Sequence, residues 1–172
     1  MVLLLILQSL WFVFPAYAAN AAPVLIKGSR PLDFRTHLGK NRLLGDGKTF
    51  EGAAGGIIVG IVAGLIQNAL IPSLPAGLGL ARFSMELLLL LAAGAIIGDI
   101  IGAFIKRRLG IPRGYPAPLL DQLDFLVGAL LAASAVVGVG KSMAIALLVL
   151  TPIIHAATNR ISFWLKMKKV PW

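Results

Sequence analysis

The chain has 172 residues, of which 58% are hydrophobic and 13% charged, and its mean hydropathy is +0.89. This composition excludes a soluble globular domain and is typical of a protein that crosses a membrane several times. The net charge is +9 and cysteine is absent. Cations at the ends of membrane helices bind anionic lipid head groups, so the charge requires no nucleic-acid partner. The lack of cysteine excludes disulfides and thiolate chemistry.

Five apolar segments are long enough to cross a bilayer. Backbone polar groups must be satisfied internally in lipid, and these segments lack the period-two alternation of a membrane β-barrel, so we expect helices. We therefore predict an all-α, multispanning membrane protein that forms one integral-membrane domain over residues 1–172. The predicted transmembrane helices cover residues 3–26, 50–71, 83–105, 119–139 and 142–163.

The first segment contains Ala16-Tyr17-Ala18, which is similar to a signal-peptidase site. Cleavage there would place loop 27–49, with its six cations, outside the cell. The segment also lacks a positively charged region before it. We therefore interpret it as a membrane helix rather than as a leader.

The cations indicate the orientation of the chain. Loop 27–49, loop 106–118 and the C-terminal end carry fourteen of the sixteen Lys and Arg residues, and only Arg82 and Lys141 lie opposite. Because positive charge accumulates on the cytoplasmic side of membrane proteins, we expect both loops and the C-terminus to be cytoplasmic and the N-terminus to be outside.

Glycines recur at every fourth position in the second and third segments. Small residues at this spacing let helix backbones approach closely, so we predict helix–helix contacts that bring the cytoplasmic ends of these helices together. The glycines concerned are Gly52, Gly56, Gly60 and Gly64, followed by Gly94, Gly98 and Gly102.

Aspartates lie where membrane helices rarely tolerate them. Asp99 shares a helix face with Lys106 and lies ~10 Å deeper, and Asp121 and Asp124 share a face of the next helix. Such charges normally face a cavity, a partner or a metal. We predict a Mg²⁺ site that also binds phosphates, with Lys106 and Arg107 beside it. The alternatives are stabilisation of a helix N-terminus by Asp121 and Asp124, and a buried pair of Asp99 with an arginine.

A glycine-rich segment, Gly45-Asp46-Gly47-Lys48-Thr49, precedes the second predicted helix. Its backbone amides and Lys48 can bind an anion at the positive end of the helix dipole. It is not a P-loop, because the first glycine of that motif would fall at Arg42 and no strand precedes it.

Two of these motifs resemble those of the phosphatidate cytidylyltransferases. The stretch Lys48–Gly56 is similar to their KT-aromatic-EG-x-x-GG pattern, and Gly98-Asp99, Lys106-Arg107 and Asp121-x-x-Asp124 resemble their C-terminal signature. The resemblance implies metal-binding roles for the three aspartates. The chain departs from the pattern at Ala103, where a small polar residue is usual, at Gln122, where Arg is usual, and at residues 112–118, which replace a Gly/His-rich segment.

The short five-helix form is similar to the archaeal branch of this family, the CDP-archaeol synthases. Pro31-Leu32-Asp33-Phe34, His155-x-x-x-Asn159 and the terminal Pro171-Trp172 carry this resemblance. It implies a Mg²⁺-dependent nucleotidyltransferase of phospholipid biosynthesis in the cell membrane, with its active site facing the cytoplasm. Such an enzyme transfers CMP from CTP to an isoprenoid-ether glycerol phosphate and releases pyrophosphate.

The expected site contains two sets of residues. Asp46 is expected to face either metal or cytidine, and Thr151, His155 and Asn159 share a stripe that either lines the site or forms interhelical bonds around Pro152. The expected catalytic residues are Asp99, Asp121, Asp124, Lys106 and Arg107, and the expected CTP- or phosphate-binding residues are Arg42, Gly45, Asp46, Gly47, Lys48, Thr49, His155 and Asn159.

The main rival interpretation is a small ion or solute transporter that uses intramembrane carboxylates, and a third is a non-catalytic lipid-binding scaffold. Transporters place such acids near the membrane midplane and contain repeats, whereas six of the seven acids here lie on the cytoplasmic side. The expected partners are CTP, the lipid phosphate and membrane lipids, without nucleic acid, and the sequence leaves open whether a homodimer forms.

Overall fold

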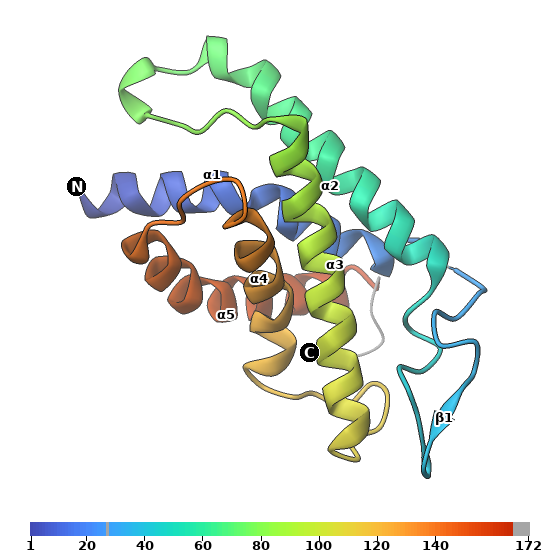
Figure 1. The fold of residues 1–172 in the computed structure, drawn as a ribbon. Coiled ribbons are helices and arrows are strands. Elements are labelled where there is room, and N and C mark those ends of the chain that lie inside the picture. Colours follow the sequence, from blue (N-terminus) through green and yellow to red (C-terminus); the bar gives the residue numbers. More distant parts are fainter. Residues whose placement is uncertain (27, 167–172) are drawn as a thin grey trace.

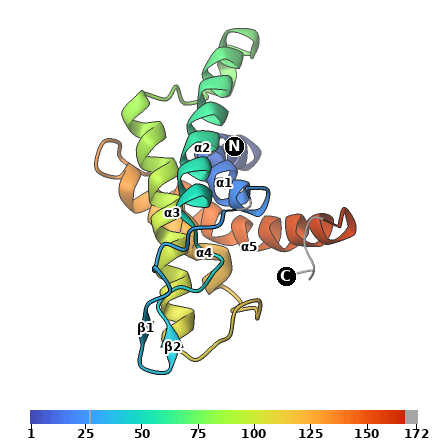
Figure 2. The same ribbon diagram turned by 90° about the vertical axis from the view of Figure 1, so that its right-hand side faces the viewer.

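The structure is a computed structural model that describes residues 1–26 and 28–166. Each predicted segment corresponds to one α-helix. The fifth helix, α5, lies transverse to the third, α3, instead of running alongside it (Figures 1 and 2). Lys27 and the terminal Pro171-Trp172, on which predictions were made above, lie outside the described residues. The helices are α1 (Val2–Ala21), α2 (Phe50–Leu70), α3 (Met85–Arg108), α4 (Leu120–Ala133) and α5 (Lys141–Trp164).

Four helices in the described part of the chain are long and apolar enough to cross a membrane, namely α1, α2, α3 and α5. The fourth predicted span, residues 119–139, is shorter than expected. Helix α4 has 14 residues, or about 21 Å at 1.5 Å per residue, against a hydrocarbon core of about 30 Å. It ends at Ala133, and the connection that follows contains Gly138 and Gly140, which favour helix less than other residues except proline.

Helix ends follow local chemistry. The side chains of Thr49 and Ser84 cap α2 and α3 by accepting hydrogen bonds from the backbone N–H groups of Gly52 and Leu87, each at 3.1 Å. Helix α1 ends at Ala21, five residues earlier than predicted, because Pro23 follows in a short 3₁₀ turn, η1 (Ala22–Val24). Helix α3 continues to Arg108, three residues beyond the predicted end.

The loop between α1 and α2 contains an unpredicted antiparallel hairpin. Strands β1 (His37–Leu38) and β2 (Asn41–Arg42) pair His37 with Arg42 and Leu38 with Asn41 (Figure 2). Gly39 lies in the two-residue turn with a φ of +66°. This hairpin and the connection from α3 to α4 lie at the same end of the molecule, opposite the connection from α2 to α3 (Figure 1).

The predicted glycine contacts are confirmed. A Cβ on Gly60 of α2 would lie 2.8 Å from both the Ala92 Cβ of α3 and the Pro15 carbonyl oxygen of α1. A Cβ on Gly98 of α3 would overlap the carbonyl group of Asp124, so α3 and α4 touch backbone to backbone. The core around these contacts comes from α1, α3 and α4, with the fully buried side chains Val13, Ala16, Leu88, Leu91 and Leu126.

Candidate active site

The structure brings the three predicted aspartates to one cavity of about 170 Å³. Asp99 comes from the interior of α3, whereas Asp121 and Asp124 come from the first turns of α4. The backbone contact between Gly98 and Asp124 holds these parts of the two helices together. The cavity is also lined by Gly47, Lys48, Lys106, Arg107, Arg113 and Gly114.

Two lysines pair with two of the aspartates. The Lys106 ammonium group donates to both carboxylate oxygens of Asp121, at 2.8 and 2.9 Å, and to the Tyr115 carbonyl oxygen at 2.8 Å. The Lys48 ammonium group donates to Asp99. The alternative that Asp99 pairs with an arginine is therefore wrong, because its partner is a lysine from the glycine-rich loop.

Asp124 is packed more tightly than the other two aspartates. Its carboxylate accepts a hydrogen bond from the Phe125 N–H at 2.6 Å and lies against α3 at Gly102. A Cβ on Gly102 would overlap this carboxylate. Gly102 therefore leaves room for a functional side chain in addition to bringing helices together.

The donor set suits a hard cation and phosphates, although no metal cluster is preformed. Among residues 1–26 and 28–166, no three His, Cys, Asp or Glu side chains lie close enough to form a metal site. Mg²⁺ uses one or two carboxylates together with phosphate oxygens and water, which the cavity can accommodate. The buried Arg107 Nε has no hydrogen-bond partner among the described residues, so it can donate to an anion in the cavity.

Asp33 organises the loop between α1 and α2. Its buried carboxylate accepts hydrogen bonds from Arg42, at 2.7 and 3.1 Å, and from the N–H groups of Leu44 and Gly45, at 3.1 and 3.0 Å. Arg42 also pairs with Asp46 at 2.9 Å. Arg42, Gly45 and Asp46 therefore shape the loop and do not line the charged cavity, and the Thr49 hydroxyl is engaged as the cap of α2.

The Asp33 network predicts a pH-dependent loop. The Arg42 guanidinium holds the pKa of Asp33 well below its usual range. Because the pKa of Asp33 is lower in the folded loop than in the unfolded chain, the ionised carboxylate stabilises the folded loop. This stabilisation is complete above the unfolded pKa of about 4 and is lost progressively as the pH falls below that value. We expect hydrogen-exchange protection of residues 37–45, corrected for intrinsic rates, to be constant at neutral pH and to decline below about pH 4. Protection in Asp33→Asn should lack this decline, and an equal decline in both proteins would contradict the assignment.

The hairpin docks on the end of α3. The Arg108 guanidinium donates to the carbonyl oxygens of Leu38 and Arg42, at 2.9 and 2.8 Å, and the Asn41 amide donates to the Arg107 carbonyl oxygen at 3.1 Å. These bonds fix the helical turn that carries Lys106 and Arg107. This role of Arg108 was not predicted from the sequence.

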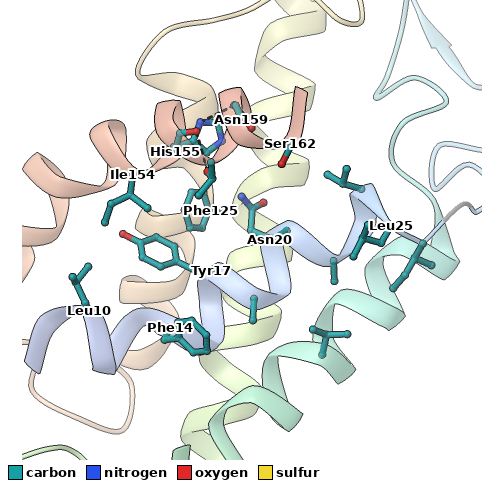
Figure 3. Close-up of a pocket in the computed structure, with 17 residues that line it drawn as sticks. Leu10, Phe14, Tyr17, Asn20, Leu25, Phe125, Ile154, His155, Asn159 and Ser162 are labelled. Atoms are coloured by element: carbon teal, nitrogen blue, oxygen red, sulfur yellow. Dashed lines mark hydrogen bonds between the residues drawn. The ribbon is translucent and has the colours of Figure 1, made fainter. Parts of the chain in front are cut away.

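An apolar groove of about 690 Å³ runs between α1 and α5 (Figure 3). Leu10 and Phe14 from α1 and Ile154 from α5 line its apolar part, whereas Asn20 and Asn159 provide polar groups (Figure 3). Asn159 is buried, and its amide nitrogen lies 3.2 Å from His155 Nδ1. Thr151 forms an interhelical bond of 2.7 Å with the Tyr17 hydroxyl. The stripe on α5 therefore serves both predicted purposes, since Thr151 joins helices while His155 and Asn159 line the groove.

A third cavity, of about 350 Å³, joins the groove to the charged cavity. It shares Asn20, Val24, His155 and Asn159 with the groove. At its other end it shares Gly47, Lys48, Asp99, Lys106, Gly114 and Asp121 with the charged cavity. An apolar space thus leads through a polar junction to a cluster of charges.

Arg113 and Asn20 are among the cavity residues that were not predicted from the sequence. Arg113 lies in the charged cavity, and its position in the basic loop 106–118 was the available signal. Asn20 lies at the junction, and an amide at the end of a long apolar segment could have marked it.

The whole chain matches one family. The CarS-like family model, described as CDP-archaeol synthase, matches residues 2–172. The chain is 45% identical over 168 residues to the CDP-archaeol synthase of Pyrococcus horikoshii, with 97% of each chain covered. It is 44% identical over 173 residues to that of Pyrobaculum calidifontis, with 97% of this chain and 98% of the relative covered.

A solved structure is also similar. It is described as an intramembrane enzyme for archaeal membrane lipids biosynthesis, and it matches with a TM-score of 0.74 and 42% sequence identity over 90% of this chain and 94% of that one. The resemblance found in the sequence motifs is thereby confirmed over nearly the full length. This multi-pass membrane protein belongs to the CDP-archaeol synthase family.

Proposed function

We propose that this chain transfers CMP from CTP to an isoprenoid-ether glycerol phosphate, giving a CDP-lipid and pyrophosphate. The observation that carries this proposal is the continuous path from an apolar groove, through a polar junction, to a charged cavity. A lipid phosphate has the same three parts in the same order: apolar chains, a glycerol ether and a dianionic phosphate. Family membership supports the same reaction.

The reaction requires neutralisation of charge more than acid–base chemistry. A phosphate monoester is mostly dianionic at neutral pH, with a second pKa of about 6, and is therefore already a nucleophile. One of its oxygens attacks the α-phosphorus of CTP, and the bond from that phosphorus to the bridging oxygen of pyrophosphate breaks. The protein has to align two polyanions and stabilise the charge that develops. Lys48, Lys106, Arg107 and Arg113 supply this positive charge in the cavity.

Mg²⁺ is the proposed cofactor, and one or two of the carboxylates of Asp99, Asp121 and Asp124 would hold it together with the substrate phosphates. When bound, it supplies Lewis-acid polarisation of phosphoryl oxygens and neutralises their charge. Lys48 and Lys106 neutralise Asp99 and Asp121 in the structure. Their long flexible side chains can instead reach phosphates that enter the same cavity.

The lipid is proposed to lie in the groove, with its phosphate at Asp99 and Lys106. Its glycerol would then occupy the junction, where Asn20 and Asn159 offer amide donors to the ether oxygens. His155 and Asn159, expected to bind CTP or phosphate, are thus assigned to the glycerol. CTP is proposed to enter the charged cavity from the aqueous side, because a polyanion cannot cross the apolar groove cheaply.

The experiment that tests this function uses the purified full chain, CTP labelled in the cytosine ring and 2,3-di-O-geranylgeranylglycerol phosphate. We expect label to enter the lipid phase with one pyrophosphate released per label transferred. If the protein instead moves ions across vesicle membranes and incorporates no label into lipid, it is the rival transporter and the proposal is refuted.

Lys48 should act on the nucleotide. Lys48→Ala is expected to weaken CTP binding about tenfold or more, because it removes a charge-assisted contact to phosphate. Stability should hardly change, since the Lys48 and Asp99 side chains are each 25% exposed and water in the cavity can hydrate Asp99 once Lys48 is removed. Calorimetric titration with CTP and thermal unfolding in detergent measure the two effects. Intact CTP affinity with altered dependence on lipid would assign the loop to the other substrate.

We further propose that all five helices lie in one membrane domain, with the N-terminus outside and the charged cavity open to the cytoplasm. The concentration of cations in the two loops at one end supports this orientation. The chain has no cysteine, so single cysteines give a clean readout. Lys40→Cys and Leu109→Cys are expected to react with an impermeant thiol reagent only from the cytoplasmic face, and Gly77→Cys, in the opposite connection, only from outside. The reverse pattern would overturn the orientation.

A further inference from the structure

We propose a second lipid-binding site, for the head group of an anionic membrane phospholipid, at a cavity of about 510 Å³ beside the start of α2. This cavity shares no lining residue with the groove, the charged cavity or their junction. It is therefore separate from the path of the reacting lipid. Its lining residues are Ser29, Arg30, Pro31, Phe34, Arg35 and Phe50.

The cavity lies where two candidate membrane spans end. The first span runs to Val24 and the second begins at Phe50, which itself lines the cavity. The Phe34 ring packs against the Phe50 ring at a centroid distance of 5.3 Å and is 78% exposed. Exposed Phe rings at a membrane interface lie at the boundary between head groups and acyl chains.

The charges of the cavity suit an anion. Arg30 is bound to Glu51 at 3.0 Å, with 76% of its side chain exposed. The exposed Arg35 guanidinium makes no hydrogen bond or ion pair with another described residue. A guanidinium binds phosphate through two parallel hydrogen bonds. Arg35 thus offers a complete phosphate-binding fork beside two aromatic rings.

The backbone displays these side chains at a conformational cost. Phe34 and Arg35 both adopt left-handed conformations, with φ values of 46° and 63°, which residues with a Cβ disfavour. The Arg35 N–H donates to the buried Asp33 carboxylate at 3.0 Å, which holds the turn in this shape. Strain that the surroundings maintain is concentrated at functional positions. Here it places an aromatic ring and an unpaired cation side by side on the surface.

A membrane phospholipid uses every part of this cavity. Its phosphate meets Arg35, its glycerol and upper chains meet the Phe34 and Phe50 rings, and the adjacent spans keep it at the right depth. A free phosphate ion would use only the arginines. Each basic residue near an anionic membrane surface strengthens lipid binding about fivefold.

The test compares lipid retention by the detergent-purified full chain, measured by native mass spectrometry with phosphatidylglycerol or phosphatidylcholine at equal concentration. The double variant Phe34→Gly/Arg35→Gly removes both side chains and relieves both left-handed conformations, so its unfolding temperature should equal or exceed that of the wild type. The matched control is Arg82→Ala, which removes an exposed arginine near the start of α3, at the opposite end of the molecule.

We expect the wild type and Arg82→Ala to retain phosphatidylglycerol over phosphatidylcholine and the double variant to bind phosphatidylglycerol at least fivefold more weakly. CMP transfer in neutral detergent should be equal in all three proteins. The transfer assay therefore tests the proposed reaction, and phosphatidylglycerol retention tests this site independently of it. Equal phosphatidylglycerol retention by the double variant would overturn the proposal. Complete displacement by an equal concentration of inorganic phosphate would do so too, because it would identify a site for the free ion.

Discussion

Replacing Asp121 by Asn is expected to slow CMP transfer roughly 10²-fold or more, the effect of losing one preorganised electrostatic group. The Asp121 carboxylate holds the Lys106 ammonium group through both oxygens and accepts the Ala117 N–H at 2.8 Å. Asn keeps the shape of the side chain and removes the charge. Asp99→Asn and Asp124→Asn should lose activity to a similar extent, because all three carboxylates line one small cavity.

The measurement is kcat at saturating CTP and lipid, repeated at limiting Mg²⁺. A residue that binds the cation should also raise the Mg²⁺ concentration required for half-maximal rate, whereas a residue that only positions a lysine should not. The matched control is Glu86→Gln, an exposed carboxylate in the first turn of α3 at the far end from the cavity. A near-normal rate in any of the three Asn variants at limiting Mg²⁺ would remove that residue from the proposed metal site.

The second large effect is expected at Gly98. In a helix interior, replacing Gly by Ala normally stabilises the protein by about 1 kcal/mol. Gly98→Ala would therefore be stabilising if no neighbouring atom occupied the space beside Gly98. The methyl group of the new alanine would instead overlap the backbone carbonyl group of Asp124, which cannot move aside as a flexible side chain can. We expect a loss of about 3 kcal/mol, as for overpacked cores. Activity should fall as well, because the change pushes Asp124 away from Asp99.

Thermal unfolding in detergent and the rate of CMP transfer measure this prediction. Gly138→Ala provides the control, because a Cβ at Gly138 would meet no atom within 4 Å. An unfolding temperature of Gly98→Ala at or above that of the wild type would show that α3 and α4 are not in backbone contact at this point.

Hydropathy located all five helices, because satisfying the backbone in lipid requires long apolar segments. Helix ends were less predictable. Pro23 stops α1 and α4 ends at Ala133, although the stretches that follow are as apolar as the helices before them. Repeated glycines predicted close packing of α3, but its partner Gly128 is a single glycine without any periodicity and escaped notice.

The charged cavity was largely foreseeable, since carboxylates are so costly in a membrane that they mark a site. The roles of Arg42 and Asp46 were not. Both belong to the glycine-rich region that resembles a phosphate-binding loop, yet Arg42 pairs with Asp33 and with Asp46. Sequence alone does not show which carboxylate an arginine will reach across a loop. The apolar groove was not predicted, because its apolar side chains, such as Leu10, Phe14 and Ile154, do not differ in kind from the other apolar residues of the same segments.

The polar junction also bears on the stereochemistry of the proposed reaction. The groove reaches the charged cavity through the junction, whereas Arg107 and Arg113 line the cavity and not the junction. A lipid phosphate and a nucleotide that arrive from different directions place the attacking oxygen and the departing pyrophosphate on opposite faces of the α-phosphorus. In the proposed reaction we therefore expect a single displacement within a ternary complex, with inversion of configuration at phosphorus and without a nucleotidyl group attached to the protein.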